Sequence, residues 1–411
     1  MISDRLLAIV RCADCGVGVL ERPSIPELPR VLRVPPEGGN HDSPEGGSDD
    51  WLVCTGCGRR YEATGDYLDM RPLETFAEQT KYLDEALHAD ARHERVSPPL
   101  LGSRIRNDML RSFLAPGPGE LVVDLGCGSG RALLWNRDSG ATMVGIDIAP
   151  FFSQEARQQV DLMLGDLRTL PFPDGTFDKA WSLDVLEHLS PEALAGVLAE
   201  ASRVLRPGGA LFVYTHVRKN APIASGLRMI NRLAQFLDRR GVIDLRQEHL
   251  RKSDHLNPLR DVPHLEQVVD AAGFRIARIR FYTPIVGGFV ENILMRIAER
   301  AMARRRQLST SKEPTSREPT PKGPTSKEPT IKGPTARERG SGAANALAIR
   351  EARLAAKARI ARRGPTYLAL RALSLAMKLD LLLFGRITSG PFFALLVKKD
   401  ARPESRANTR E

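Results

Sequence analysis

The chain lacks a long hydrophobic run and a segment that resembles a secretory leader. A helix that crosses a membrane needs about 20 apolar residues, and no stretch of that length is free of charge. The apolar residues 6–10 are followed at once by Arg11 and Cys12, which makes that run too short for a signal peptide. We therefore expect a cytoplasmic protein, and 411 residues are enough for two or three domains.

Aromatic residues are scarce where positive charge is most abundant. Residues 301–411 hold 24 Lys and Arg against 9 Asp and Glu, whereas residues 1–300 hold 36 against 41. The basic segment lacks the interleaved aromatic side chains on which nucleic-acid bases stack, so nucleic acid is a less favoured partner. Five proline-containing pentads at residues 311–335 cannot form a helix or bury a core. We expect a disordered linker over residues 307–342.

Residues 121–130, LVVDLGCGSG, are the most informative stretch of the chain. An apolar strand runs into Asp124, and glycines follow at alternate positions, where they let the backbone turn tightly and approach a ligand. A second apolar strand at residues 143–146 ends in Asp147, whose carboxylate is placed to accept hydrogen bonds from a ribose. Several nucleotide-binding folds have a glycine loop of this kind. The second acidic residue, Asp147, reduces the number of folds that fit the sequence.

Four motifs in a fixed order carry a resemblance to a known family. They are VVDLGCGSG at 122–130, VGIDIAP at 144–150, LMLGDLRTLPFPDGTFDKAWSLDVLEHL at 162–189 and LRPGGALFVYTH at 205–216. Together they resemble a class I S-adenosyl-L-methionine (SAM)-dependent methyltransferase of the small-molecule group, methyltransferase type 11 or ubiquinone/menaquinone-methyltransferase-like. The resemblance implies an α/β Rossmann-like fold, SAM as cofactor and methyl transfer as the reaction.

The resemblance also implies a cofactor site of ten residues. These are Asp124, Gly126, Gly128, Gly130, Asp147, Ile148, Asp166, Leu167, Ser182 and Leu183. The glycine loop would wrap the methionine part of SAM, with Asp124 close to its amino group. Asp147 would bind the ribose hydroxyls and Asp166 the adenine amino group, with the next apolar residue of each segment on the adenine. Ser182 and Leu183 would face the sulfonium.

The N-terminal region carries two C-x-x-C pairs, Cys12 with Cys15 and Cys54 with Cys57. Each pair presents two thiolates to one ion, and two pairs complete a closed tetrahedral site. The pattern favours structural Zn²⁺ over a redox pair, and a cytoplasmic chain argues against disulfides. The fifth cysteine, Cys127, lies in the glycine loop without a paired base, which favours a small loop residue over a nucleophile.

The text around the cysteines resembles the zinc ribbon of the tRNA-methyltransferase activator family, which is often fused ahead of a methyltransferase. Ala13 stands where the family commonly has a proline after the first cysteine, and residues 67–68 stand where it has Ile-Pro near the end of the domain. We expect the following organisation, with a separate C-terminal appendage as the alternative to an insertion. The segments are a zinc ribbon at 1–72, a SAM-binding core at 73–282, a helical insertion at 283–388, the last core strand at 389–400 and a disordered tail at 401–411.

Methyl transfer from a sulfonium needs mainly alignment of the acceptor, which contributes about 7–11 kcal/mol, so a dedicated base is not required for every acceptor. The candidates for a base are His188 and His216. Both are weak, because the segment 184–188 (DVLEH) around His188 is generic in the family and a histidine such as His216 is more often a solvated or capping residue. The acidic residues of that segment, with His188, are also candidates for a divalent-ion site. His249 or His255 lie where acceptor-facing residues usually come from.

Three amphipathic segments with basic residues at their edges, 222–240, 284–306 and 367–384, suit the headgroup region of an anionic membrane. They suit equally a helical cap on the core. The sharper hypothesis is a hydrophobic or lipid-linked small-molecule acceptor and peripheral membrane contact. The alternatives are tRNA or protein methylation, with recognition by the ribbon, and a non-catalytic SAM-binding scaffold. The sequence defines neither the acceptor atom (O, N or C) nor the oligomeric state.

Overall fold

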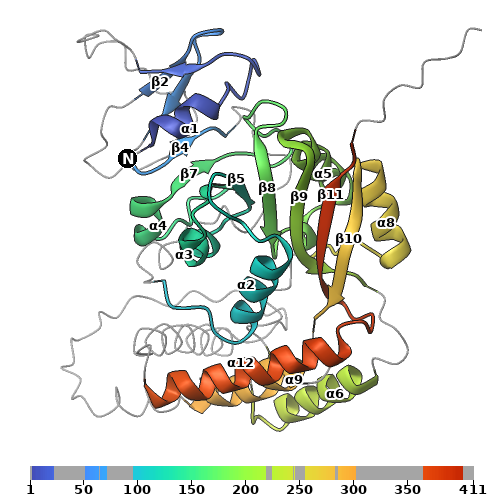
Figure 1. Cartoon of the computed structure of the whole chain (residues 1–411). Helices are drawn as coiled ribbons and strands as arrows, with labels where there is room; N and C mark the ends of the chain where they lie inside the picture. Colours follow the sequence, from blue (N-terminus) through green and yellow to red (C-terminus); the bar gives the residue numbers. More distant parts are fainter. Residues whose placement is uncertain are drawn as a thin grey trace, which may run out of the picture.

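The computed structural model describes residues 2–22, 51–63, 65–71, 96–218, 225–243, 245, 255–282, 286–301 and 364–400. The linker expected at 307–342 and the tail expected at 401–411 lie outside these residues. A large mixed sheet forms the centre of the molecule, with a small cysteine-bearing sheet at one end and a layer of helices at the other (Figure 1).

The large sheet has eight strands. In spatial order they are β10 (Phe274–Phe281), β11 (Pro391–Lys398), β9 (Leu205–His216), β8 (Phe177–Leu183), β5 (Leu121–Leu125), β6 (Thr142–Asp147), β7 (Asp161–Leu164) and β4 (Leu68–Asp69). The strands from β9 to β4 are parallel, and β11 runs antiparallel to both of its neighbours. This is the predicted Rossmann-like α/β fold, and the fold-class prediction is confirmed.

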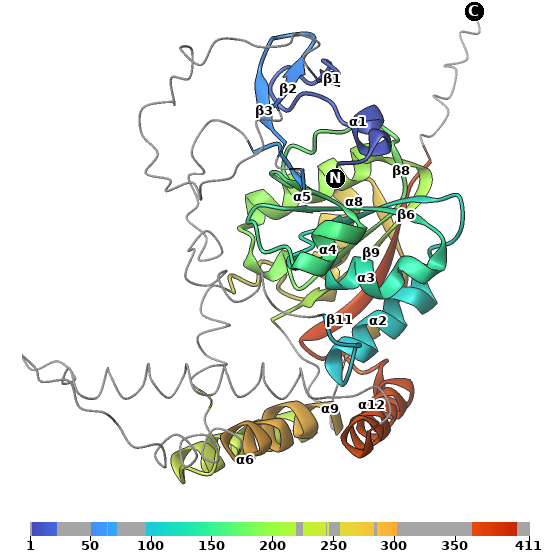
Figure 2. The ribbon, with the colours of Figure 1, turned by 90° about the vertical axis from the view of Figure 1, so that its left-hand side faces the viewer.

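Helices cover both faces of the sheet, which explains why its central strands are apolar throughout. Val122 and Val123 of β5 are consecutive and point to opposite faces, yet both are buried in separate hydrophobic clusters. One face carries α2 (Gly102–Phe113), α3 (Arg131–Asn136) and α4 (Gln154–Gln159), and the other carries α5 (Pro191–Val204) and α8 (Val262–Ala271) (Figure 2). Two 3₁₀ turns, η4 (Arg137–Ser139) and η5 (Leu186–His188), lie in the connections.

The cysteine-bearing region is built from α1 (Asp4–Ile9) and the antiparallel strands β1 (Leu20–Glu21), β2 (Trp51–Cys54) and β3 (Arg60–Glu62). Hydrogen bonds attach this region to the core in addition to the chain connection. The Ser3 hydroxyl donates to Asp161 Oδ2 at 2.7 Å, and the Arg11 amide donates to the Pro171 carbonyl at 2.9 Å. The segment expected to be ribbon also supplies β4, the edge strand of the large sheet.

The helical layer combines α6 (Ser225–Arg239), which follows β9, with helices that lie between β10 and β11. The first of these begins as α9 (Val286–Phe289), continues as a π-helical turn (Val290–Leu294) and extends as α-helix to residue 301. The second is α12 (Pro365–Phe384). The three lie side by side below the sheet (Figure 1). Among the described residues, no helix combines the length and the apolarity needed to cross a membrane.

Three polar residues attach α12 to its neighbours, two of them to α2 and the residue before it and one to α9. Ser374 Oγ accepts a hydrogen bond from the Leu101 amide at 2.9 Å, and Lys378 pairs with Asp108 of α2 at 3.1 Å. Asp380 is 3% exposed, and its Oδ2 accepts hydrogen bonds from the amides of Val286 and Gly287. Because these amides are the free donors at the start of α9, Asp380 caps one helix of the layer from the side chain of another.

Candidate functional site

A cavity of about 440 Å³ opens at the carboxyl ends of β5, β6 and β8, between α2 and η5. Eight of the ten predicted cofactor residues line it. They are Asp124, Gly126, Gly128, Asp147, Ile148, Asp166, Leu167 and Leu183. The carboxyl edge of a parallel sheet, at the point where strand order reverses, is the usual ligand site of such folds. Here β5 is that point, because β6 and β8 flank it.

The glycine loop follows β5 and has the backbone shape that its glycines predict. Gly126 and Gly128 have φ values of +83° and +53°, a region that residues with a Cβ rarely adopt. A Cβ on Gly126 would lie 2.4 Å from Val185 Cγ2. The amides of Gly126 and Cys127 donate to the Ile146 carbonyl. The loop is thus fixed against β6 and leaves its inner side open to the cavity.

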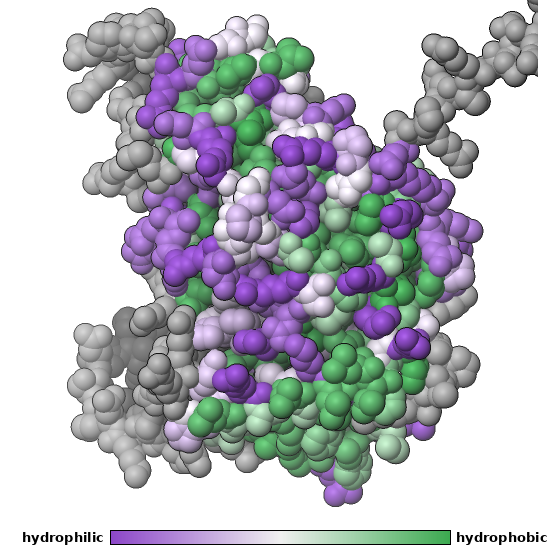
Figure 3. Space-filling view, viewed as in Figure 1, coloured by the Kyte–Doolittle hydropathy of each residue, from purple (hydrophilic) through white to green (hydrophobic). Residues whose placement is uncertain are grey.

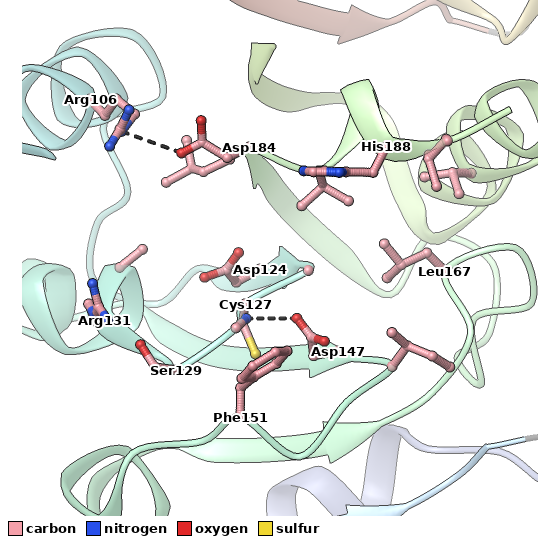
Figure 4. A pocket seen from close by; sticks show the side chains of 18 of the residues that line it. Arg106, Asp124, Cys127, Ser129, Arg131, Asp147, Phe151, Leu167, Asp184 and His188 are labelled. Atoms are coloured by element: carbon pink, nitrogen blue, oxygen red, sulfur yellow. Dashed lines mark hydrogen bonds and ion pairs between the residues drawn. The ribbon is translucent and has the colours of Figure 1, made fainter. Parts of the chain in front are cut away.

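Asp147 is bound by the backbone on both carboxylate oxygens. The Gly128 amide donates to Oδ2 at 2.7 Å (Figure 4). The Ala149 amide donates to Oδ1 at 3.0 Å. Burial raises the pKa of this carboxyl, and the amides oppose that shift. Since a carboxylate offers about four acceptor positions, Asp147 retains capacity for hydroxyl donors from a bound ligand.

Asp124 is the most deeply buried acid of the cavity, at 2% exposed. Burial raises its pKa to about 8, and the nearby Asp147 carboxylate adds to the shift. A carboxyl in this state favours a cation beside it, because a positive charge restores the ionised form. Asp124 is therefore suited to a ligand with a positive charge next to the glycine loop.

The opposite wall contains an ion pair that the sequence analysis missed. The Arg106 guanidinium of α2 lies 3.5 Å from Asp184 and 5.2 Å from the centre of the Tyr214 ring (Figure 4). Asp184 has a φ of +58°, which is rare for a residue with a side chain and is a common form of strain at binding sites. The amphipathic pattern of residues 102–113, directly before the glycine-loop strand, was the available signal for Arg106.

Three predicted site residues do not line the cavity. Ser182, predicted at the sulfonium, is 1% exposed, and its hydroxyl donates to the Leu125 carbonyl at 3.0 Å. Gly130 instead caps α3 at a φ of +76°, where a Cβ would lie 2.6 Å from Ala156 Cβ. His216 lies behind the wall with its Nδ1 3.4 Å from Glu187 Oε1, whereas His188 lines the cavity.

The four cysteines of the two C-x-x-C pairs converge. Their Sγ atoms all lie within 4.8 Å of one another. The Sγ–Sγ distance is 3.6 Å between Cys12 and Cys57 and also 3.6 Å between Cys15 and Cys54. Tetrahedral Zn–S bonds of about 2.3 Å place sulfurs roughly 3.8 Å apart, so this donor set fits one Zn²⁺.

The turns around the cysteines also suit this cluster. Gly16 and Gly58, which follow the two pairs, have φ values of +73° and +76°. A Cβ on Gly18 would lie 2.1 Å from Cys54 Sγ. Cys127 is separate from the cluster, and burial raises the pKa of its thiol well above the ordinary value, which argues against a nucleophile.

The comparisons with known proteins agree with the geometry. A methyltransferase-domain family matches residues 123–213. The chain is 42% identical over 104 residues to a demethylmenaquinone methyltransferase of Corynebacterium kroppenstedtii, covering 25% of this chain and 44% of the relative. It is 37% identical over 101 residues to a malonyl-[acyl-carrier protein] O-methyltransferase of Serratia marcescens, covering 24% and 39%.

Among solved structures, phosphoethanolamine N-methyltransferase 2 of Haemonchus contortus with SAM has a TM-score of 0.43 at 14% identity, covering 78% of this chain and 61% of that one. The chain spans less than half the length of the two curated relatives that it matches. The matched segment contains the glycine loop, Asp147 and Asp166. Residues 123–213 of this chain therefore match a methyltransferase domain.

Proposed function

We propose that the protein is a SAM-dependent methyltransferase. The observation that carries the proposal is the convergence of the glycine loop, Asp124 and Asp147 on one cavity at the switch point of the sheet. SAM supplies a methyl group that is already activated by the positive sulfur. The protein has to hold this cofactor, place the acceptor in line with the S–CH₃ bond and exclude water.

Different residues of the cavity would bind different parts of SAM. Asp124 would hold the ammonium group of the methionine part, since its buried carboxyl favours an adjacent cation. Asp147 would accept the two ribose hydroxyls beside its two backbone amides. Ile148 and Leu167 would pack on the adenine, and Asp166, which already accepts from Arg168 at 2.9 Å, would take its amino group.

We also infer that the Cys12, Cys15, Cys54 and Cys57 cluster holds structural Zn²⁺. All four positions of a tetrahedral ion are filled by thiolates, which leaves no position for substrate. The metal would therefore stabilise the N-terminal fold and not take part in methyl transfer.

For the acceptor we propose a hydrophobic or lipid-linked small molecule, met at a membrane surface. Leucine side chains form an exposed face on α12 (Figure 3). They are Leu368, Leu375, Leu379, Leu382 and Leu383, each more than half exposed. Exposed Arg371 and Arg386 lie on and just after this helix. Apolar side chains with flanking arginines suit anionic lipid headgroups, and a demethylmenaquinone methyltransferase among the relatives acts on a compound of this hydrophobic kind.

The test is transfer of label from methyl-labelled SAM into a cell extract, followed by separation of organic, nucleic-acid, protein and water-soluble fractions. Label in the organic fraction supports the proposed acceptor. Label in RNA or protein supports the alternative in which the ribbon recognises a macromolecule. SAM binding without label in any fraction supports a non-catalytic scaffold. The Asp147→Ala protein is the background control.

Membrane contact has its own test, which is flotation with anionic vesicles at low salt. Wild-type protein should float, and a Leu379→Gln/Leu382→Gln/Leu383→Gln protein should remain in the dense fraction. Neutral vesicles and a Val17→Gln variant, at an exposed apolar side chain of the cysteine-bearing region, serve as controls. If wild-type protein does not float with anionic vesicles, the membrane proposal is wrong, while methyl transfer is unaffected.

A further inference from the structure

A second cluster of potential metal ligands lies beside the cavity. Glu187, His188 and His255 each place one ligand atom so that all three lie within 4.8 Å of one another. The cluster joins two distant parts of the chain, since Glu187 and His188 belong to η5 and His255 lies in the segment before α8. Asp184, which the sequence analysis grouped with this acidic segment, pairs instead with Arg106.

Main-chain hydrogen bonds hold the segment of His255 next to the segment of Glu187 and His188. The Asn257 amide donates to the Glu187 carbonyl at 2.9 Å, and the Arg218 side chain donates to the carbonyls of Leu256 and Asn257. The His188 and His255 rings lie edge to face with centroids 4.5 Å apart. The position of His255 is therefore set by main-chain contacts and not by its side chain alone.

Glu187 is also oriented from behind. Its Oε2 accepts a hydrogen bond from Thr215 Oγ1 at 2.9 Å, and its Oε1 lies 3.4 Å from His216 Nδ1. The residue is 2% exposed, so these contacts fix the direction of the carboxylate. Partners of this kind behind a ligating group are a regular feature of metal sites, where they set its orientation.

We propose that Glu187, His188 and His255 bind a divalent cation of the Zn²⁺ type next to the methyl-donor cavity. Two imidazoles and one carboxylate are ligands that Zn²⁺ accepts at about 2.0–2.2 Å, and small side-chain rotations would close the cluster to those distances. Three protein ligands leave a coordination position open, which is the arrangement of catalytic rather than structural zinc sites. His188 lines the cavity, so a cation held by these three residues would lie at the cavity wall.

The role of this cation is to bind the acceptor heteroatom, an inference that rests on the proposed methyl transfer. A cation lowers the pKa of a bound hydroxyl or thiol, whose proton passes to solvent. The heteroatom then forms a bond to the methyl carbon, the C–S bond breaks, and the sulfur keeps the electron pair as a neutral thioether. His216 is a positioning residue in this arrangement, because it contacts Glu187.

The experiment counts cations in the full chain after removal of metal with a chelator and reconstitution with Zn²⁺ or Co²⁺. We expect two cations per wild-type chain and one after His255→Ala or after Cys54→Ser/Cys57→Ser. Co²⁺ at the cysteine cluster gives thiolate-to-metal charge-transfer absorption, which His255→Ala should leave intact. His264→Ala, a histidine of α8 outside the cluster, should retain both cations.

One cation per wild-type chain, lost with the cysteines, would overturn the proposal, as would an unchanged count in His255→Ala. SAM binding to each variant, measured by calorimetry, controls for folding. Where His255→Ala fails to bind SAM, His188→Gln replaces it in the count. Failure of the wild-type protein to bind SAM would refute the proposed function and leave the cation count to be read separately.

Discussion

The Gly128 amide donates a 2.7 Å hydrogen bond to Oδ2 of Asp147 and thereby ties the loop after β5 to the end of β6. The two residues are far enough apart in sequence to belong to different motifs, yet they form one wall of the cavity. The carboxylate thus orders the glycine loop and also presents its remaining acceptor positions to the cavity.

Asp147→Ala should reduce the affinity for SAM at least tenfold, or about 1.4 kcal/mol. The substitution removes the proposed ribose acceptor and frees the Gly128 amide. Titration calorimetry measures the effect. Asp138→Ala, an acid on η4 outside the cavity, should bind SAM with wild-type affinity. Unchanged affinity in Asp147→Ala would remove this residue from the site.

SAM binding at pH 7 should release up to one proton from Asp124. With a pKa of about 8 the free carboxyl is mostly protonated at this pH, and the ammonium group of the ligand favours its ionised form. Calorimetry in two buffers of different ionisation enthalpy gives the proton count. The count should fall toward zero above pH 9 and should be absent in Asp124→Asn. Equal proton release by both proteins would contradict the assignment.

The raised pKa of Asp124 also predicts how the stability of the ligand-free protein changes with pH. The pKa of Asp124 lies above the value of about 3.9 expected in the unfolded chain. The folded state therefore binds the proton more tightly, and the contribution of this group to the free energy of unfolding declines as the pH rises from about 4 to 8. Asp124→Asn should show a flatter dependence over that range in urea unfolding.

The cysteine cluster should lose its zinc when Gly18 acquires a side chain. A Cβ at this position would lie 2.1 Å from Cys54 Sγ, so the sulfur has to move out of the tetrahedral arrangement. Gly18→Ala should release zinc to a chromogenic chelator faster than the wild-type protein does. Val17→Ala, at a side chain that is 77% exposed, should release it at the wild-type rate. Identical rates in all three proteins would argue against zinc at this cluster.

Asp380→Ala should destabilise the helical layer by about 1–3 kcal/mol, because it leaves two amide donors of α9, one half-buried and one buried, without their carboxylate. Urea unfolding followed by circular dichroism measures the loss. Leu379→Ala, the exposed neighbour, should cost far less. A loss for Asp380→Ala no larger than that of the control would show that the cap does not contribute.

The sequence predicted the core of this protein well because the information there is local. Glycines at fixed spacing and an acid at a strand end define the loop and Asp147 without any distant partner. The direction of the Ser182 hydroxyl could not be predicted, because it depends on the Leu125 carbonyl of a neighbouring strand. Arg106 and the pairing of His255 with Glu187 were missed for the same reason, since each depends on an element far away in the chain.

The position of β11 makes completion of the sheet depend on the last part of the described chain. This strand inserts between β9 and β10, and its Phe392 and Phe393 are fully buried. During synthesis, β9 and β10 leave the ribosome more than a hundred residues before their shared neighbour. Until then both present unpaired hydrogen-bonding edges, which other chains can pair with. The partly folded chain can therefore aggregate during the time needed to translate the residues between β10 and β11. A chaperone that covers the edges of β9 and β10 during this time would favour correct folding.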